Sequence, residues 1–359
     1  MSGAPSRNHY ADAGVWRLGS LSLRMPLRPQ LVVLGLVGLL MLAVILALIT
    51  GPGGVTPATA LNALAGNGPT PQLLLVREIR LPRIGAGVLA GAGLGAAGCL
   101  LQTVARNHLA TPAILGINEG ATFAMMLALI LSASGQLGGW WVAPAGAGLT
   151  AVVLLLLAGR MGSRGYRVLI VGLGVSAALR AATELGLAWS SLQHASAIYA
   201  WSIGSLVGRG EALSPALGAT VLALILIALI LGRSLALLQL NVATATTLGL
   251  NVNRCQLQAF TLAVALSGMA VGIGGPVGGP VGLLALASPI IARKLEGPER
   301  VPTLSSALVG AILLILADTL GRVIAAPAEI PAGVIASIFG GPFLLWILIT
   351  DGRRGNATP

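Results

Sequence analysis

Charged residues inside strongly apolar stretches are the feature of this sequence most able to do chemistry. Arg180 and Glu184 lie four residues apart, a spacing that places both side chains on one face of a helix. An ion pair between them would lower the cost of burying two charges. We keep two interpretations open, a structural pair and a relay for protons or substrate, because charge within a membrane usually serves function. Asp318 and Arg322 repeat the spacing, and a structural pair is the simplest interpretation there.

Three arginines precede a long apolar stretch at intervals of three residues, Arg77, Arg80 and Arg83. The planar guanidinium group forms paired, charge-assisted hydrogen bonds with carboxylates, which makes the cluster a candidate for contact with an acidic partner. The alternative is that these long side chains extend from the apolar stretch to the water interface. The histidines, by contrast, are dispersed over different segments, so we predict no metal site (His9, His108 and His194).

Motifs for enzymatic chemistry are absent from the sequence. It contains no G-x-x-x-x-G-K-[ST] phosphate loop, so the chain has no visible means of hydrolysing ATP. No Ser/His/Asp or H-E-x-x-H arrangement is present, and Cys99 and Cys255 lack the paired spacing of a zinc site or disulfide framework. We therefore expect a protein that is not an enzyme and that has no cofactor of its own.

Composition indicates that membrane helices must position these residues. Hydrophobic residues make up 56% of the 359 residues and charged residues only 9%, against about 25% charged in a soluble domain. An apolar stretch of about twenty residues crosses the hydrocarbon core as a helix. We predict an all-α polytopic membrane protein with about ten transmembrane helices, near residues 29–50, 82–104, 115–134, 140–159, 167–189, 213–232, 255–273, 278–293, 303–324 and 331–350.

The distribution of Lys and Arg between these stretches predicts the topology. With the N-terminus in the cytosol, 15 of them fall on the cytosolic side and 5 on the other, with Arg180 left inside the membrane. That bias favours cytosolic N- and C-termini. Residues 1–28 carry four arginines and lack the apolar core of a signal peptide, so we interpret them as a cytosolic tail, with a second at 351–359. The net charge of +11 is then a topology signal and does not indicate nucleic-acid binding.

Glycine and alanine are abundant within the predicted helices, as in the run from Gly85 to Gly98. Small residues let helix backbones approach closely in lipid, which predicts a dense bundle. The segment 272–289 contains so many glycines and prolines that we do not expect a continuous helix. Because broken membrane helices face protein or a water-filled path, we expect this segment near a translocation pathway.

Four motifs in order along the chain resemble those of the FecCD-type permeases, which import ferric siderophores, haem and cobalamin. They are Arg80-Leu-Pro-Arg83; Arg106-Asn-His-Leu-Ala-Thr-Pro-Ala-Ile-Leu-Gly116; Leu248-Gly-Leu-Asn-Val-Asn-Arg254; and Ala317-Asp-Thr-Leu-Gly-Arg322 with Glu329-Ile-Pro-Ala-Gly-Val334 and Gly341-Pro-Phe343. The resemblance covers roughly residues 30 to 350, and the family also has about ten spans.

The resemblance implies that residues 29–350 form the permease domain of an ATP-binding-cassette importer. In that family two permease subunits, identical or different, form a central path. Two cytosolic ATPase subunits bind ATP and Mg, and a periplasmic or lipid-anchored binding protein delivers the chelate. By position, three arginines match those that dock the binding protein, Arg80, Arg83 and Arg322.

The resemblance also implies a cytosolic coupling loop at residues 233–254, which contacts the ATPase. Its candidate contacts are Thr247, Leu248, Gly249, Val252 and Arg254. The Leu248-Gly249 step would form a corner, because glycine adopts backbone angles that other residues avoid. The translocation pathway is expected near the broken segment, at Gly279, Pro280, Gly282 and Pro289.

The sequence departs from the family pattern in ways that leave the cargo open. Residues 279–290 lack the phenylalanine and histidine of many members, Glu119 stands in a segment that is usually uncharged, and Arg180 is not a general family feature. We expect a permease that moves an iron-siderophore or related metal chelate across a bacterial inner membrane by alternating access. The alternative is a proton-coupled secondary transporter that uses Arg180 and Glu184.

Overall fold

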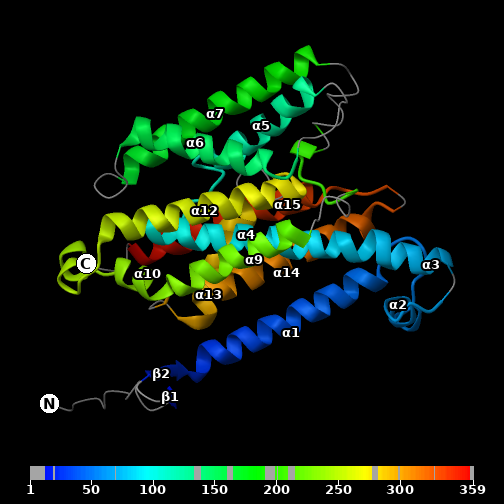
Figure 1. Ribbon diagram of the computed structural model, residues 1–359, viewed down its shortest axis with the longest axis horizontal. Helices are drawn as coiled ribbons and strands as arrows, with labels where there is room; N and C mark the ends of the chain where they lie inside the picture. The colour runs from blue at the N-terminus through cyan, green and yellow to red at the C-terminus, as the bar shows by residue number, and fades with distance from the viewer. Residues whose placement is uncertain are drawn as a thin grey trace.

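A bundle of long helices makes up the fold (Figure 1). The computed structural model describes residues 13–18, 21–68, 70–132, 139–159, 165–190, 199, 201–208, 215–276, 282–297, 300–326 and 328–355. The first half contains β1 (Ala13–Leu18), β2 (Leu21–Pro26), α1 (Leu27–Ile49), α2 (Pro57–Leu64), α3 (Thr70–Leu74), the π-helix η1 (Leu75–Arg80), α4 (Leu81–Ala105), α5 (Ile117–Leu131), α6 (Val142–Ala158) and α7 (Gly165–Trp189). The second half contains α9 (Pro215–Ile230), α10 (Gly232–Leu238), α11 (Val242–Thr247), α12 (Val252–Gly274), α13 (Leu283–Glu296), α14 (Thr303–Ile324) and α15 (Ala332–Gly355).

Each of the ten predicted apolar stretches coincides with one helix, namely α1, α4, α5, α6, α7, α9, α12, α13, α14 and α15. The helical fold is therefore confirmed for the described residues, with one short antiparallel hairpin, β1–β2, inside the predicted N-terminal tail. Among the described residues, five helices are long and apolar enough to cross a membrane alone, and α9 with α10 forms a sixth such unit bent by 53°. The helices α5, α6 and α13 are shorter, and the 15 residues of α5 reach only about 22 Å.

The helix α4 lies at the centre of the bundle, against α12, α13 and α14. Its glycines allow this contact, because a Cβ at Gly95 would lie 2.2 Å from the carbonyl oxygen of Ser306 in α14. At Gly98, a Cβ would lie 1.9 Å from the carbonyl oxygen of Ala285 in α13. The dense packing predicted from the small residues is thus a backbone-to-backbone contact along α4.

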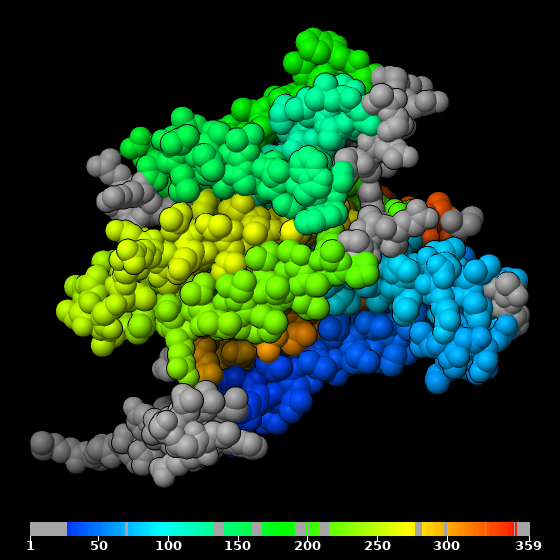
Figure 2. Space-filling model, viewed as in Figure 1, coloured from blue at the N-terminus to red at the C-terminus, as the bar shows by residue number. Residues whose placement is uncertain are grey.

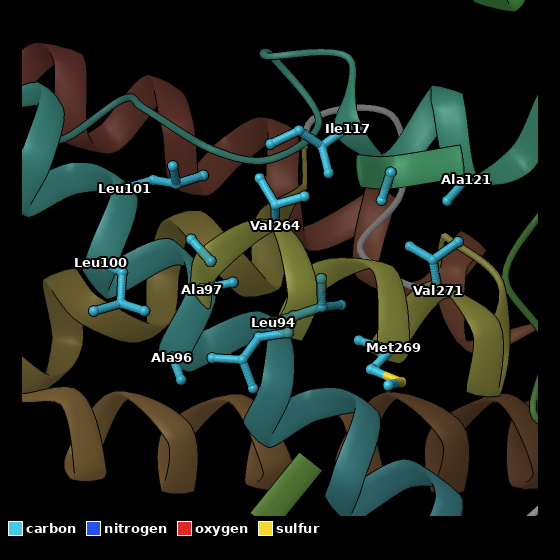
Figure 3. Packing of buried hydrophobic residues seen from close by; sticks show 14 of the residues in the cluster. Leu94, Ala96, Ala97, Leu100, Leu101, Ile117, Ala121, Val264, Met269 and Val271 are labelled. Atoms are coloured by element: carbon cyan, nitrogen blue, oxygen red, sulfur yellow. The ribbon is translucent and has the colours of Figure 1, made fainter. Parts of the chain in front are cut away.

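Apolar side chains complete the core around these contacts. Figure 3 shows Leu94 and Leu101 of α4 beside Val264 and Met269 of α12, with Ile117 from the start of α5 close by. Leu94, Leu101 and Ile117 are each exposed by 1% or less. A single large cluster of buried residues therefore joins α4, α5 and α12.

The helices α5, α6 and α7 form a layer on one side of α12, whereas α1 lies on the opposite side of the bundle (Figures 1 and 2). The layer is attached mainly through α6, where a Cβ at Gly268 of α12 would lie 2.8 Å from the Cα of Pro144. The outer helix α7 is only 17% buried over its apolar window, against 78% for the span that contains α4. A wide face of α7 is therefore available to lipid or to another subunit.

The predicted break in the segment 272–289 is confirmed. The helix α12 ends at Gly274, and α13 begins after Gly282, which has a left-handed backbone with φ of +64°. A second irregular segment, residues 106–116, connects α4 to α5. The two irregular segments meet, because a Cβ at Gly282 would lie 3.2 Å from the Cβ of Ala113.

The four predicted pathway residues have different positions relative to this break. Gly282 lies at the start of α13. Pro289 is buried inside α13, and the helix continues past it. Gly279 and Pro280 lie outside the described residues. The sequence predicted a broken segment as far as residue 289, but α13 already begins at Leu283, so the break ends earlier.

The two ends of the bundle differ. The arginine end, defined by Arg80, Arg83 and Arg322, also carries α2 and α3, and the loop end carries α10 and α11. The hairpin β1–β2 and the last turns of α15 lie toward the loop end (Figure 1). At that end Arg28 Nε donates to the carbonyl oxygen of Leu295 over 3.0 Å, which joins the start of α1 to the end of α13.

The close contact of α4 with α14 predicts that one methyl group added at Gly95 destabilises the bundle. Gly95→Ala should lower the free energy of unfolding by about 1–3 kcal/mol, because its Cβ must displace the Ser306 carbonyl or shift a helix. The matched control is Gly38→Ala in α1, where nothing lies within 4 Å of the added Cβ, and it should be neutral or slightly stabilising. Thermal unfolding of both variants in detergent checks this; equal melting temperatures would contradict the packing described.

Candidate functional site

A buried ion-pair network joins α4, α14 and the segment before α15 at the arginine end. Arg83 Nη2 lies 2.8 Å from Asp318 Oδ1, and Arg83 Nη1 lies 2.7 Å from Glu329 Oε2. Asp318 also pairs with Arg322, whose Nε lies 3.3 Å from Asp318 Oδ2. The predicted Asp318–Arg322 pair is thus confirmed, and Asp318 is shared between two arginines.

Arg80 and Arg322 also bind backbone carbonyls at the end of α1. Arg80 donates to the carbonyl oxygens of Leu48, of Pro52 at 2.8 Å and of Gly51 at 3.3 Å. Arg322 donates to the carbonyl oxygen of Ala47 at 3.2 Å. The last four carbonyls of a helix lack partners within it and form the negative end of its dipole, so cations stabilise this end.

The structure therefore brings together the three arginines that the sequence proposed as a docking site, but it places them inside the chain. Arg80, Arg83 and Arg322 are 3%, 8% and 4% exposed. For these three arginines, burial contradicts the alternative in which the long side chains extend to the water interface. All three guanidinium groups bind carbonyls or carboxylates of this chain. Their direct contact with a binding protein stays a prediction.

A polar cavity lies where α5, α7 and the start of α15 approach one another. Its volume is about 410 Å³, and its lining includes Asn118, Glu119, Thr122, Arg180, Thr183, Glu184, Tyr199, Ser202 and Ser337. The carboxylate of Glu119 lies 2.8 Å from Arg180 Nη2. Arg180 is 47% exposed at its side chain and Glu119 17%, so the guanidinium group is open to the cavity.

The predicted pairing of Arg180 with Glu184 is wrong as a direct contact, because Arg180 pairs with Glu119 of α5. The cause is the close approach of α5 to α7 at Gly116, where an added Cβ would lie 3.1 Å from the backbone nitrogen of Ser176. About one turn further along both helices, Glu119 and Arg180 face each other. Glu184 lines the same cavity beside the pair.

The broken segment reaches this cavity. Pro276 and Ala113 both line it, and they belong to the two irregular segments that meet near Gly282. The sequence predicted the break from glycine and proline but not the cavity beside it, and the translocation pathway expected there stays a prediction. The sequence also missed Asn118, Thr122 and Ser337 as lining residues, and their only signal was a polar side chain within an apolar stretch.

The predicted coupling segment forms an exposed corner at the loop end. Thr247 ends α11, Leu248 is 59% exposed, and Gly249 has a φ of +86°, as the prediction of a glycine corner required. Val252 begins α12 and is 9% exposed, while Arg254 donates its backbone N–H to the side chain of Asn251 over 3.1 Å. Four of the five predicted contacts therefore lie on the surface, and Val252 anchors the corner.

Within the described residues, no group of three His, Cys, Asp or Glu side chains could hold a metal ion. Cys99 and Cys255 are buried as free thiols. The arrangement as a whole consists of a buried charged network at one end, a polar cavity inside, and an exposed corner at the other end.

Comparison with known proteins gives this arrangement a context. The profile of the FecCD transport family matches residues 39–350. The ferric enterobactin transport system permease protein FepG of Escherichia coli strain K12 is 33% identical over 84% of this chain and 91% of its own length. The Fe(3+)-citrate import system permease protein YfmE of Bacillus subtilis strain 168 is 35% identical over 91% of this chain and 97% of its own length.

Solved structures give the same answer for the fold. A protein described as a metal-chelate type ABC transporter in an inward-facing conformation superimposes with a TM-score of 0.75 at 25% identity, over 90% of this chain and 99% of that one. The fold and these relatives define a polytopic membrane permease of the ATP-binding-cassette type. The chain belongs to the FecCD transport family, as its four motifs indicated.

Because two arginines share the carboxylate of Asp318, we predict that removing its charge destabilises the protein more than removing the charge of Glu329. Asp318→Asn should lower the free energy of unfolding by about 3 kcal/mol or more, because Arg83 and Arg322 then repel each other while buried. Glu329→Gln should cost no more than about 1 kcal/mol, because Glu329 is 30% exposed and Arg83 keeps Asp318. Melting temperatures in detergent decide the order, and a larger loss for Glu329→Gln would contradict it.

Proposed function

We propose that this chain is one permease subunit of an ATP-driven importer for ferric siderophores or related metal chelates. The observation that carries the proposal is the family match along residues 39–350, with relatives named for ferric enterobactin and ferric citrate transport. The sequence contains no phosphate-binding loop, so hydrolysis of ATP, with its Mg, belongs to a separate partner. The chain itself supplies a path and no bond-breaking chemistry.

The topology that fits this role has ten spans with both chain ends in the cytosol of a bacterium, in its inner membrane. The 15 to 5 distribution of Lys and Arg supports it, as does the position of the hairpin and the end of α15 toward one end of the bundle. The loop end is then cytosolic and the arginine end external. Residues 1–28 and 351–359 would be cytosolic, although α15 extends to Gly355.

The partners follow from the two ends. The exposed corner with Thr247, Leu248 and Gly249 is suited to rest against an ATPase subunit. At the external end the buried arginines would shape the surface that meets a binding protein, by fixing the chain after α1 at Gly51 and Pro52. A second permease, identical or different, would cover the exposed face of α7.

The cavity is suited to line the path between two such subunits. Glu184 lies on the exposed side of α7, and charge facing lipid is costly, so this face requires water or protein opposite it. Nucleotide-driven movement of the corner would open the path alternately to the two sides. The cavity combines polar and charged side chains with small or apolar residues such as Ala113 and Gly333, which suits a polar chelate that must be released again.

The direct test is uptake of an iron-55-labelled ferric chelate by proteoliposomes that contain this permease with its ATPase and second permease. We expect accumulation that requires ATP on the loop side and loaded binding protein on the arginine side, and that continues after the proton gradient is collapsed. Glu119→Gln with Arg180→Gln, which removes the pair without net charge, should reduce uptake several-fold. Uptake without ATP that stops when the proton gradient is collapsed would support secondary transport and overturn the proposal.

A further inference from the structure

Arg106 stands out at the loop end because of its backbone. It ends α4 with φ of 49° and ψ of 33°, and it is the only non-glycine residue with positive φ in the part of the chain that the structure describes. A left-handed conformation is unfavourable for a residue with a Cβ, so surrounding contacts must hold it. Its backbone N–H caps α4 by donating to the carbonyl oxygens of Gln102 and Thr103.

The side chain of Arg106 supplies such contacts on another element. Its Nη2 donates to the carbonyl oxygen of Leu238 at 2.8 Å and to that of Leu240 at 2.6 Å. Leu238 is the last residue of α10, and Leu240 immediately precedes Asn241, the N-cap of α11. One guanidinium group therefore holds both sides of the joint between the two helices of the coupling segment, where carbonyls lack helical partners.

At this joint the coupling segment makes a further side-chain contact to another element, a 3.5 Å hydrogen bond that Gln239 Nε2 donates to the carbonyl oxygen of Arg300. Within α11 only Ala245 is buried, and the neighbouring Val242 and Leu248 are 45% and 59% exposed. The helix α10, in contrast, lies against α4 and α12 and buries Leu235 and Leu238. A force on α11 can therefore enter the bundle at two places, through the joint that Arg106 holds and through the short link to α12, where Val252 is buried.

On the other side of Arg106 lies α4, the central helix, whose span is 78% buried. The helix α4 contacts α14 and α13 through glycine, where no side chain can yield. Its 25 residues extend for about 37 Å to the arginine end. After Arg106 the chain continues through residues 107–116 to α5, which carries Glu119 of the cavity.

We propose that Arg106 is the positioning residue that transmits movement of the coupling segment to α4 and, through residues 107–116, to the cavity. The inference rests on the proposed function, because it assigns the movement to an ATPase partner. The role requires two carbonyls held at once by a charged, planar group, so lysine, a compact charge on a flexible stem, should replace it only in part.

The chain contains a matched control at the opposite end. Arg77 donates through Nε to the carbonyl oxygen of Ala63 at 2.9 Å and through Nη2 to that of Leu64 at 2.8 Å. These carbonyls end α2 in the same way that Leu238 ends α10. Arg77 therefore has the same chemistry as Arg106 and lies far from the coupling segment. Unlike Arg80, Arg83 and Arg322, it does not match a docking arginine of the family.

The experiment measures chelate imported and ATP hydrolysed by the complete transporter in proteoliposomes, with R106Q, R106K, R77Q and the unchanged chain. We expect R106Q to lower the ratio of chelate to ATP at least fivefold, R106K to lower it less, and R77Q to keep the ratio of the unchanged chain. A merely structural role would reduce both quantities together and leave the ratio unchanged, which would overturn the inference.

Two further outcomes keep the result decisive. If R106Q does not assemble, R106K carries the test, and an unchanged ratio in R106K counts against the inference. If the unchanged chain imports no chelate with ATP, the proposed function fails and not the role of Arg106 alone. An equal loss of ratio in R77Q and R106Q would also overturn the inference, because the effect would not depend on the coupling segment.

Discussion

The backbone contact of α4 with its neighbours is the constraint on which the rest of the structure depends. Helices in lipid gain little from the hydrophobic effect, so they must associate by close packing. Glycines such as Gly95 and Gly98 allow that packing, because the opposing carbonyls occupy the space of a Cβ. The position of α4 then determines where Arg83 at one end and Arg106 at the other can reach.

Arginines at both ends of α4 bind segments of other elements. At one end Arg80 and Arg83 bind the carbonyls after α1 and the carboxylates of Asp318 and Glu329. At the other end Arg106 binds the joint of the coupling segment. The layer of α5, α6 and α7 is held differently, mainly by α6 against α12, and α7 stays largely exposed. We call α4 and the two helices that pack on its glycines, α13 and α14, the rigid group, and the proposed alternating access would move the layer of α5, α6 and α7 against it.

The sequence predicted the local features of this arrangement and missed those that depend on distant contacts. The apolar stretches predicted where helices lie, although only five or six of those described are long and apolar enough to span a membrane. The spacing predicted the Asp318–Arg322 pair, and glycine and proline predicted the break before α13. The partner of Arg83 is 235 residues away and that of Arg180 is 61 away, so only the packing of helices determines them. Spacing within one helix therefore suggested Glu184, although the close approach at Gly116 favours Glu119.

The most direct test of the rigid group is pulsed electron spin resonance on labelled pairs, with the transporter free of nucleotide and trapped with ATP. Labels at Leu81 of α4 and Leu304 of α14, both at exposed positions, report whether these helices slide past each other. We predict a change below about 2 Å for that pair and a change of about 5 Å or more between Leu81 and Leu185 of α7. A change between Leu81 and Leu304 as large as that between Leu81 and Leu185 would contradict the account.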